Sequence, residues 1–164
     1  MTTKAWPLAA AAALALAGAQ GAAAQDAEKA RKNVDAAIEL LRKDVATEKS
    51  DLMAKNMKLD ATQAAAFWPI YKQYEAERKA IGDDRVAVIQ DLAEHFDSLN
   101  DAKAQGLLER SFAIEDKRVA LQRKYKDEML KVLPAKTVAR FFQIDSRLNH
   151  LIDLGIASQI PLVP

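Results

Sequence analysis

The stretch from Leu59 to Ile70 reads LDATQAAAFWPI, and the stretch from Leu133 to Ile144 reads LPAKTVARFFQI. Aligned without a gap, both have a leading Leu, an Ala before an aromatic pair, and a closing Ile. Each pattern is typical of a helix start with its aromatic pair about two turns further on. The chain therefore contains the same helix-starting corner twice, either as a duplicated helical hairpin or by chance similarity. The matched residues are Leu59, Phe67 and Trp68 in the first stretch and Leu133, Phe141 and Phe142 in the second.

The two helix starts use different capping residues. Asp60 is a good N-cap because its carboxylate can accept a hydrogen bond from the first turn, and the Gln63 side chain can reach back to the Asp60 N–H. Pro134 suits the first position of a helix, where its missing N–H costs nothing. Pro69 instead lies inside the helix that Asp60 starts, so a kink is expected there.

Composition and length favour one helix-rich domain. The 164 residues are 50% hydrophobic, with five Gly and five Pro. There is no Cys, which excludes thiol chemistry and Cys-ligated metal sites. The 24 basic and 23 acidic residues are interspersed, which does not fit a nucleic-acid-binding protein.

The first 24 residues are typical of a secretory signal peptide. Lys4 precedes an Ala/Leu run from residue 8 to residue 16, and Ala22 to Ala24 supply the small residues of a cleavage site. Removing Lys4 with this segment lowers the basic residues from 24 to 23, equal to the 23 acidic ones. Residues 25–164 are expected to form a single exported helical domain that lacks a transmembrane segment and ends in an apolar tail, 156–164.

Apolar periodicity predicts an all-α fold of about four helices arranged around a long, kinked, antiparallel helical hairpin. The expected helices span residues 26–57 with an interruption near 47–50, 60–97, 102–132 and 134–155, the last ending at Gly155 as its C-cap. Asn100 is a weaker cap for the third helix. That helix has two apolar strips, which implies two neighbours. One strip contains Leu107, Ile114, Leu121, Tyr125 and Val132, and the other contains Leu108, Phe112 and Val119.

The segment Leu59-Asp60-Ala61-Thr62-Gln63 in an exported, cysteine-free helical chain resembles the Leu-Thr-x-x-Gln motif that Spy/CpxP-like periplasmic proteins use twice. The second copy, Leu133-Pro134-Ala135-Lys136-Thr137, departs from the motif because Pro replaces Thr and Thr137 replaces Gln. The resemblance covers about residues 34–154. It implies a cradle-like homodimer in the periplasm of a Gram-negative bacterium. Such proteins act as ATP-independent holding chaperones or as stress-responsive partners of sensor kinases, and related proteins bind metal.

A mixed basic and apolar surface is a candidate client-binding site. Arg78 and Arg85 fall on the same helical stripe as Ile81 and Val88. Such a surface would suit weak contact with unfolded chains. The alternative is that both arginines pair with acids of a neighbouring helix or extend from the edge of the core.

Metal binding and catalysis have little support in the sequence. His95, beside Glu94 and Asp97, and His150, near Asp153, are weak candidates for metal ligands because the ligand sets are incomplete. We expect no metal and no other cofactor. No residue pattern indicates an enzyme.

Three hypotheses follow. The protein is a periplasmic holding chaperone or envelope stress-response protein, a metal-sensing or sensor-kinase-regulating adaptor, or a structural component of the envelope. The expected partners are unfolded or envelope proteins and a second copy of the chain, with no nucleic acid.

Overall fold

The computed structural model describes residues 28–29, 32–33, 35, 38 and 45–163, and within this part the fold is all-α with no strand. The predicted signal peptide and most of the helix expected before Val45 lie outside the described residues. The elements, in chain order, are α2 (Val45–Met57), α3 (Ala61–Glu94), a short 3₁₀ helix η1 (Phe96–Ser98), α4 (Asp101–Leu130) and α5 (Ala135–Ala157).

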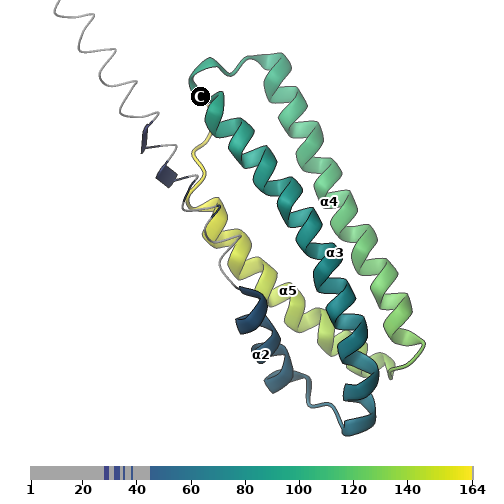
Figure 1. Cartoon of the computed structure of the whole chain (residues 1–164). Coiled ribbons are helices and arrows are strands. Elements are labelled where there is room, and N and C mark those ends of the chain that lie inside the picture. The colour runs from purple at the N-terminus through teal and green to yellow at the C-terminus, as the bar shows by residue number, and fades with distance from the viewer. Residues whose placement is uncertain (1–27, 30–31, 34, 36–37, 39–44, 164) are drawn as a thin grey trace, which may run out of the picture.

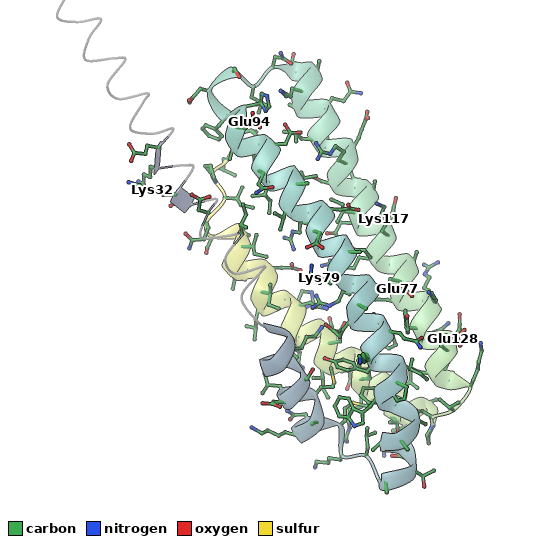
Figure 2. All side chains as sticks on the ribbon, viewed as in Figure 1. Lys32, Glu77, Lys79, Glu94, Lys117 and Glu128 are labelled. Atoms are coloured by element: carbon green, nitrogen blue, oxygen red, sulfur yellow. The ribbon has the colours of Figure 1, made fainter. Side chains whose placement is uncertain are left out.

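Helices α3 and α4 lie side by side and run in opposite directions (Figure 1). Three ion pairs join them at seven-residue intervals in both helices, which is about two turns, so a single register is kept along their length. Surface pairs of this kind each contribute only about 0 to 1 kcal/mol, so they set the alignment more than the stability. Figure 2 shows the charged side chains that surround them. The pairs are Arg110 with Asp91, Lys117 with Asp84 and Lys124 with Glu77.

Both predicted caps are confirmed. Asp60 Oδ1 accepts from the Gln63 backbone N–H at 2.8 Å, and Asn100 Oδ1 accepts from the Lys103 N–H at 3.0 Å. Within the described part of the chain, the Gln63 side chain forms no hydrogen bond back to Asp60. Helix α3 continues through Pro69 without interruption.

Replacing Asp60 with alanine should lower the free energy of unfolding by about 1 kcal/mol, because it removes the acceptor for the first turn of α3. Urea unfolding followed by circular dichroism measures this. Asp51→Ala, an exposed carboxylate in the interior of α2, is the control and should change stability by less than about 0.5 kcal/mol. Equal losses in the two variants would show that the cap contributes nothing specific.

Several helix boundaries differ from the sequence-based expectation. Helix α3 ends at Glu94 and α4 at Leu130, short of the expected residues 97 and 132. The interruption expected near residues 47–50 is wrong, because α2 continues through it with Lys49 and Met53 buried one turn apart on the same face. The C-cap expected at Gly155 is also wrong. Helix α5 extends to Ala157, because the fully buried side chain of Ile156 anchors one more turn and no residue near this end has a positive φ.

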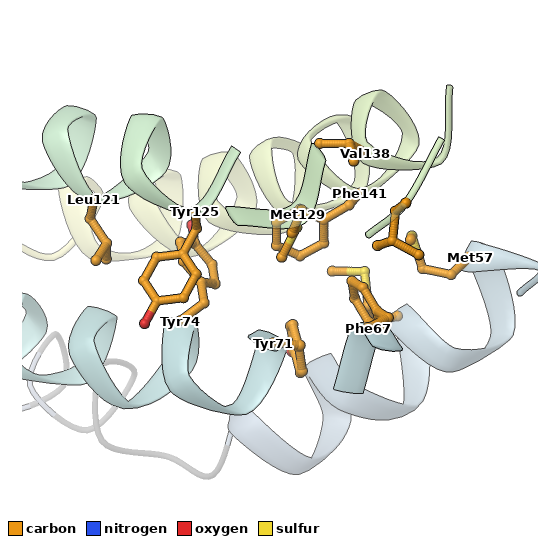
Figure 3. Close-up of a cluster of buried hydrophobic side chains, with 11 residues drawn as sticks. Met57, Phe67, Tyr71, Tyr74, Leu121, Tyr125, Met129, Val138 and Phe141 are labelled. Atoms are coloured by element: carbon orange, nitrogen blue, oxygen red, sulfur yellow. The ribbon is translucent and has the colours of Figure 1, made fainter. Parts of the chain in front are cut away.

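The two repeated stretches meet in one cluster of buried side chains, shown in Figure 3 and called here the aromatic cluster. The rings of Phe67 and Phe141 lie edge to face with centroids 5.6 Å apart. Leu59 and Leu133, the leading leucines of the two stretches, also pack into it. The two repeated stretches start helices that are far apart in the sequence, and they pack together in one hydrophobic core. The buried members are Met53, Met57, Phe67, Tyr71, Tyr74, Leu121, Tyr125, Met129, Leu133, Val138 and Phe141.

A second, smaller cluster lies at the other end of α3. Val86 and Ile89 of α3 pack there against Ile156 of α5 and Ile38. Ile160, in the predicted apolar tail, packs against this cluster. The last described residues, Leu162 and Val163, are exposed.

Candidate functional site

The outward face of α4 exposes four large apolar side chains, the last of which is Leu130 at its C-terminal end, 42% exposed. Leu108, Phe112 and Val119 are 57%, 63% and 43% exposed. Their spacing of four and seven residues places them on one face of the helix, and this set is called here the α4 strip. The strip is the second of the two apolar strips predicted for this helix. The first is buried except for Val132, which is exposed because α4 ends before it. One expected neighbour of α4 is thus present, and no described residue covers the other face.

A groove between α4 and α5 adjoins the strip. Three cations line it, Arg123 and Lys126 from α4 and Arg147 from α5, together with the half-buried ring of Phe142 and no carboxylate. Lys126 pairs with its neighbour Asp127, whereas the two arginines form no ion pair with any described residue. The side of the molecule that carries the strip therefore also carries uncompensated positive charge.

The residues predicted to bind clients are half-buried on α3. Arg78 pairs with Glu75 at 3.1 Å, and Arg85 pairs with Asp153 of α5. Arg85 therefore makes the pair with an acid of a neighbouring helix that the alternative interpretation expected, whereas the carboxylate that pairs with Arg78 belongs to its own helix. Ile81 packs against the aromatic cluster. A mixed basic and apolar surface is present, but it is formed by α4 and α5.

Asp153 holds α3, α4 and α5 together. Its two oxygens pair with Arg85 and Arg118, and Arg118 also pairs with Glu115. Burial opposes the charged form, but the two guanidinium groups lower the pKa of Asp153 below its usual value. A cavity of about 60 Å³ lies beside these groups, and each charged side chain that lines it already has an ion-pair partner, Glu75 in the case of Arg78.

A buried polar network joins α2 to α3 and α5, and sequence analysis did not predict it. The side chain of Lys49 is fully buried, with Nζ 2.8 Å from Glu75 Oε1 and 2.6 Å from Asp145 Oδ1. The Lys49–Asp145 contact is an ion pair and not a well-directed hydrogen bond. Asp145 Oδ2 accepts from the Tyr74 hydroxyl at 2.8 Å and from Asn149 at 2.9 Å. Burial and the Asp145 charge raise the pKa of Tyr74, so its hydroxyl remains a donor.

A signal for this network was present in the spacing of α2. Lys49, Met53 and Met57 are four residues apart, which places the lysine on the buried face that the methionines define. On α5, Asp145 and Asn149 continue the same four-residue spacing from Phe141. A charged residue on a buried face requires a partner, and the partners lie far away in the sequence.

The two histidines are not brought together. His95 Nδ1 lies 3.0 Å from Asp91 Oδ1 at the end of α3. His150 is exposed on α5 and lies near Ser146. Among the residues that the structure describes, no group of three or more His, Cys, Asp or Glu side chains is arranged to hold a metal ion.

No helix in the described ranges is both long enough and apolar enough to span a bilayer. Comparison with known proteins finds no matching family model, no matching curated protein and no matching solved structure.

Proposed function

We propose that the protein is an ATP-independent holding chaperone of the periplasm that binds unfolding proteins along the α4 strip. The observation that carries the proposal is the exposure of Leu108, Phe112 and Val119 on a single face of a long helix. An aromatic residue exposed between two aliphatic ones on a charged helix is costly to hydrate, so such a face favours contact with another apolar surface.

The adjoining cations suit the same activity. Arg123 and Arg147 extend the strip with positive charge that no described carboxylate neutralises. Charge increases the rate of encounter with negatively charged segments of an unfolding chain, and apolar contact prolongs the complex. Neither contact requires a fixed client structure, so the protein would act as a binding protein and not as an enzyme.

The double variant Leu108→Ser/Phe112→Ser should lose most of the ability to keep an unfolding model substrate soluble, because it removes the two most exposed members of the strip. Light scattering of the substrate at near-stoichiometric ratios without ATP measures this. The matched control is Leu151→Ser/Leu154→Ser on α5, whose side chains are 68% and 69% exposed. The control should keep its activity. Equal activity in both variants, or no activity in the unmodified protein, would contradict the proposal.

We also propose that a second copy can occupy the same strip. Two α4 helices can pair antiparallel so that Leu108 of one copy lies opposite Val119 of the other. The same alignment places Asp101 of one copy opposite Lys126 of the other, so the apolar and the charged contact form together. This arrangement would give an extended, cradle-like dimer of antiparallel helical hairpins. Dimer formation and client binding would then compete, so adding an unfolded client should shift the sizing profile of the protein from dimer to monomer–client complex.

The adaptor and structural hypotheses remain proposals with less support. No described residue cluster favours the metal-sensing form. An adaptor for a sensor kinase and a structural envelope component would each bind one constant partner, whereas a holding chaperone would bind many unfolding substrates.

A further inference from the structure

Helix α2 fills a groove between α3 and α5 with three side chains. Lys49, Met53 and Met57 lie on one face of α2, and each is at most 2% exposed. The other side chains between residues 51 and 56 are exposed. The helix therefore binds the groove in the way that an amphipathic helix of another protein would, through three buried side chains at four-residue intervals.

The groove has a different chemistry at each end. Met53 and Met57 pack into the aromatic cluster beside Phe67 and Phe141. At the other end, the carboxylates of Glu75 and Asp145 receive the Lys49 ammonium at 2.8 and 2.6 Å. The groove thus selects a helix with a cation at one position and apolar side chains four and eight positions later.

Two polar atoms of the groove have no hydrogen-bond partner among the described residues, Asp145 Oδ1, which forms an ion pair with Lys49, and the Tyr71 hydroxyl. The Tyr71 hydroxyl is buried and unpaired, although the residue is only 3% exposed. Burial raises the pKa of Tyr71 to about 12, and the Ser50 side chain of α2 lies near enough to lower it slightly.

The attachment of α2 to the rest of the fold is limited. A helix of 13 residues is marginal on its own. Its link to α3 is the segment from Lys58 to Asp60, and Lys58 has a φ of 53°, a conformation that favours glycine. The ion pairs of Asp91, Asp84 and Glu77 with α4 do not involve α2. We therefore expect that α2, although held by three buried side chains, can leave the groove by local unfolding while α3, α4 and α5 stay packed.

We propose that the α3–α5 groove is a binding site for an amphipathic helix of another protein, with α2 as its built-in competitor. The partner helix carries a lysine followed by apolar residues four and eight positions later. This site is separate from the α4 strip, and its test does not depend on chaperone activity.

The first experiment measures whether α2 opens by itself. Because the chain has no cysteine, Met53→Cys and Met129→Cys each introduce a single thiol. Both methionines are fully buried in the aromatic cluster, one on α2 and the other on α4. In the full chain, the thiol of Met53→Cys should react with a chromogenic disulfide at least ~10-fold faster than that of Met129→Cys. Equal rates would mean that α2 leaves only when the whole protein unfolds, and would overturn the proposal.

The second experiment measures binding to the opened groove. Lys49→Glu places a third carboxylate beside Glu75 and Asp145 and should release α2, whereas Leu52→Glu changes the exposed face of α2 and should not. A fluorescent peptide with the sequence of residues 45–57 should bind the full-length Lys49→Glu protein at least ~10-fold more tightly than the Leu52→Glu protein, because the competitor has been removed.

Specificity is tested with a second peptide of residues 45–57 in which Lys49 is replaced by glutamate. This peptide should bind the full-length Lys49→Glu protein no more tightly than it binds the Leu52→Glu protein. Circular dichroism checks that both full-length proteins keep their helices. If the Lys49→Glu protein does not fold, the comparison of thiol rates in Met53→Cys and Met129→Cys still tests the proposal. Equal binding of both peptides, or no binding to a folded Lys49→Glu protein, would overturn the proposal. A folded Lys49→Glu protein that elutes at twice the monomer mass and excludes the peptide would also overturn it, in favour of a second copy in the groove.

Discussion

Replacing Asp145 with alanine is expected to lower the free energy of unfolding by about 3 to 5 kcal/mol, as removal of one partner from a buried ion pair usually does. The substitution leaves the fully buried Lys49 with Glu75 as its one carboxylate partner and removes the acceptor of Tyr74 and Asn149. Urea unfolding followed by circular dichroism measures the loss.

The double variant Lys49→Met/Asp145→Leu is the informative control. It removes both charges and keeps the volume similar, so it should recover most of the stability that Asp145→Ala loses. Asp153→Ala, which affects a half-buried carboxylate of the same helix, should cost less than Asp145→Ala. If Asp145→Ala cost less than Asp153→Ala, the charge of Lys49 would not depend on Asp145.

Phe141→Ala should be about as damaging, with an expected loss of about 3 to 5 kcal/mol, because it leaves a cavity where the two repeated stretches meet. The ring of Phe141 is fully buried and contacts those of Phe67, Tyr71 and Tyr74. Phe112→Ala removes an identical side chain from the exposed α4 strip. The same unfolding measurement should show a change within about 0.5 kcal/mol for this control.

This pair of variants separates the two roles of phenylalanine in the chain. Phe141→Ala should impair folding and any binding activity together, whereas Phe112→Ala should impair binding alone. A large loss of stability in Phe112→Ala would mean that another part of the protein covers the strip.

The sequence predicted the helix starts well because capping is local chemistry. The Asp60 cap depends on a residue three positions later, and the all-α class followed from the repeating apolar positions. The two apolar strips of α4 predicted two neighbours, but no described residue covers the second strip, so Phe112 is exposed. The helix ends were less predictable, because the burial of Ile156 by residues of α3 decided where α5 stops.

The polar network could not be predicted in the same way. Lys49, Glu75 and Asp145 belong to three different helices, and the spacing that places Lys49 on the buried face of α2 does not identify its partners. Only the packing of α2 against α3 and α5 brings them together. For the same reason, Arg85 could be assigned either to a binding surface or to an ion pair until its partner on α5, Asp153, was located.

The meeting of Phe67 with Phe141 affects the order in which the protein can assemble. The first ring emerges early during synthesis, and its counterpart emerges only when most of the chain has been made. Until then, α2 and α3 have no complete core to fold around, so the nascent chain should stay extended and loosely structured.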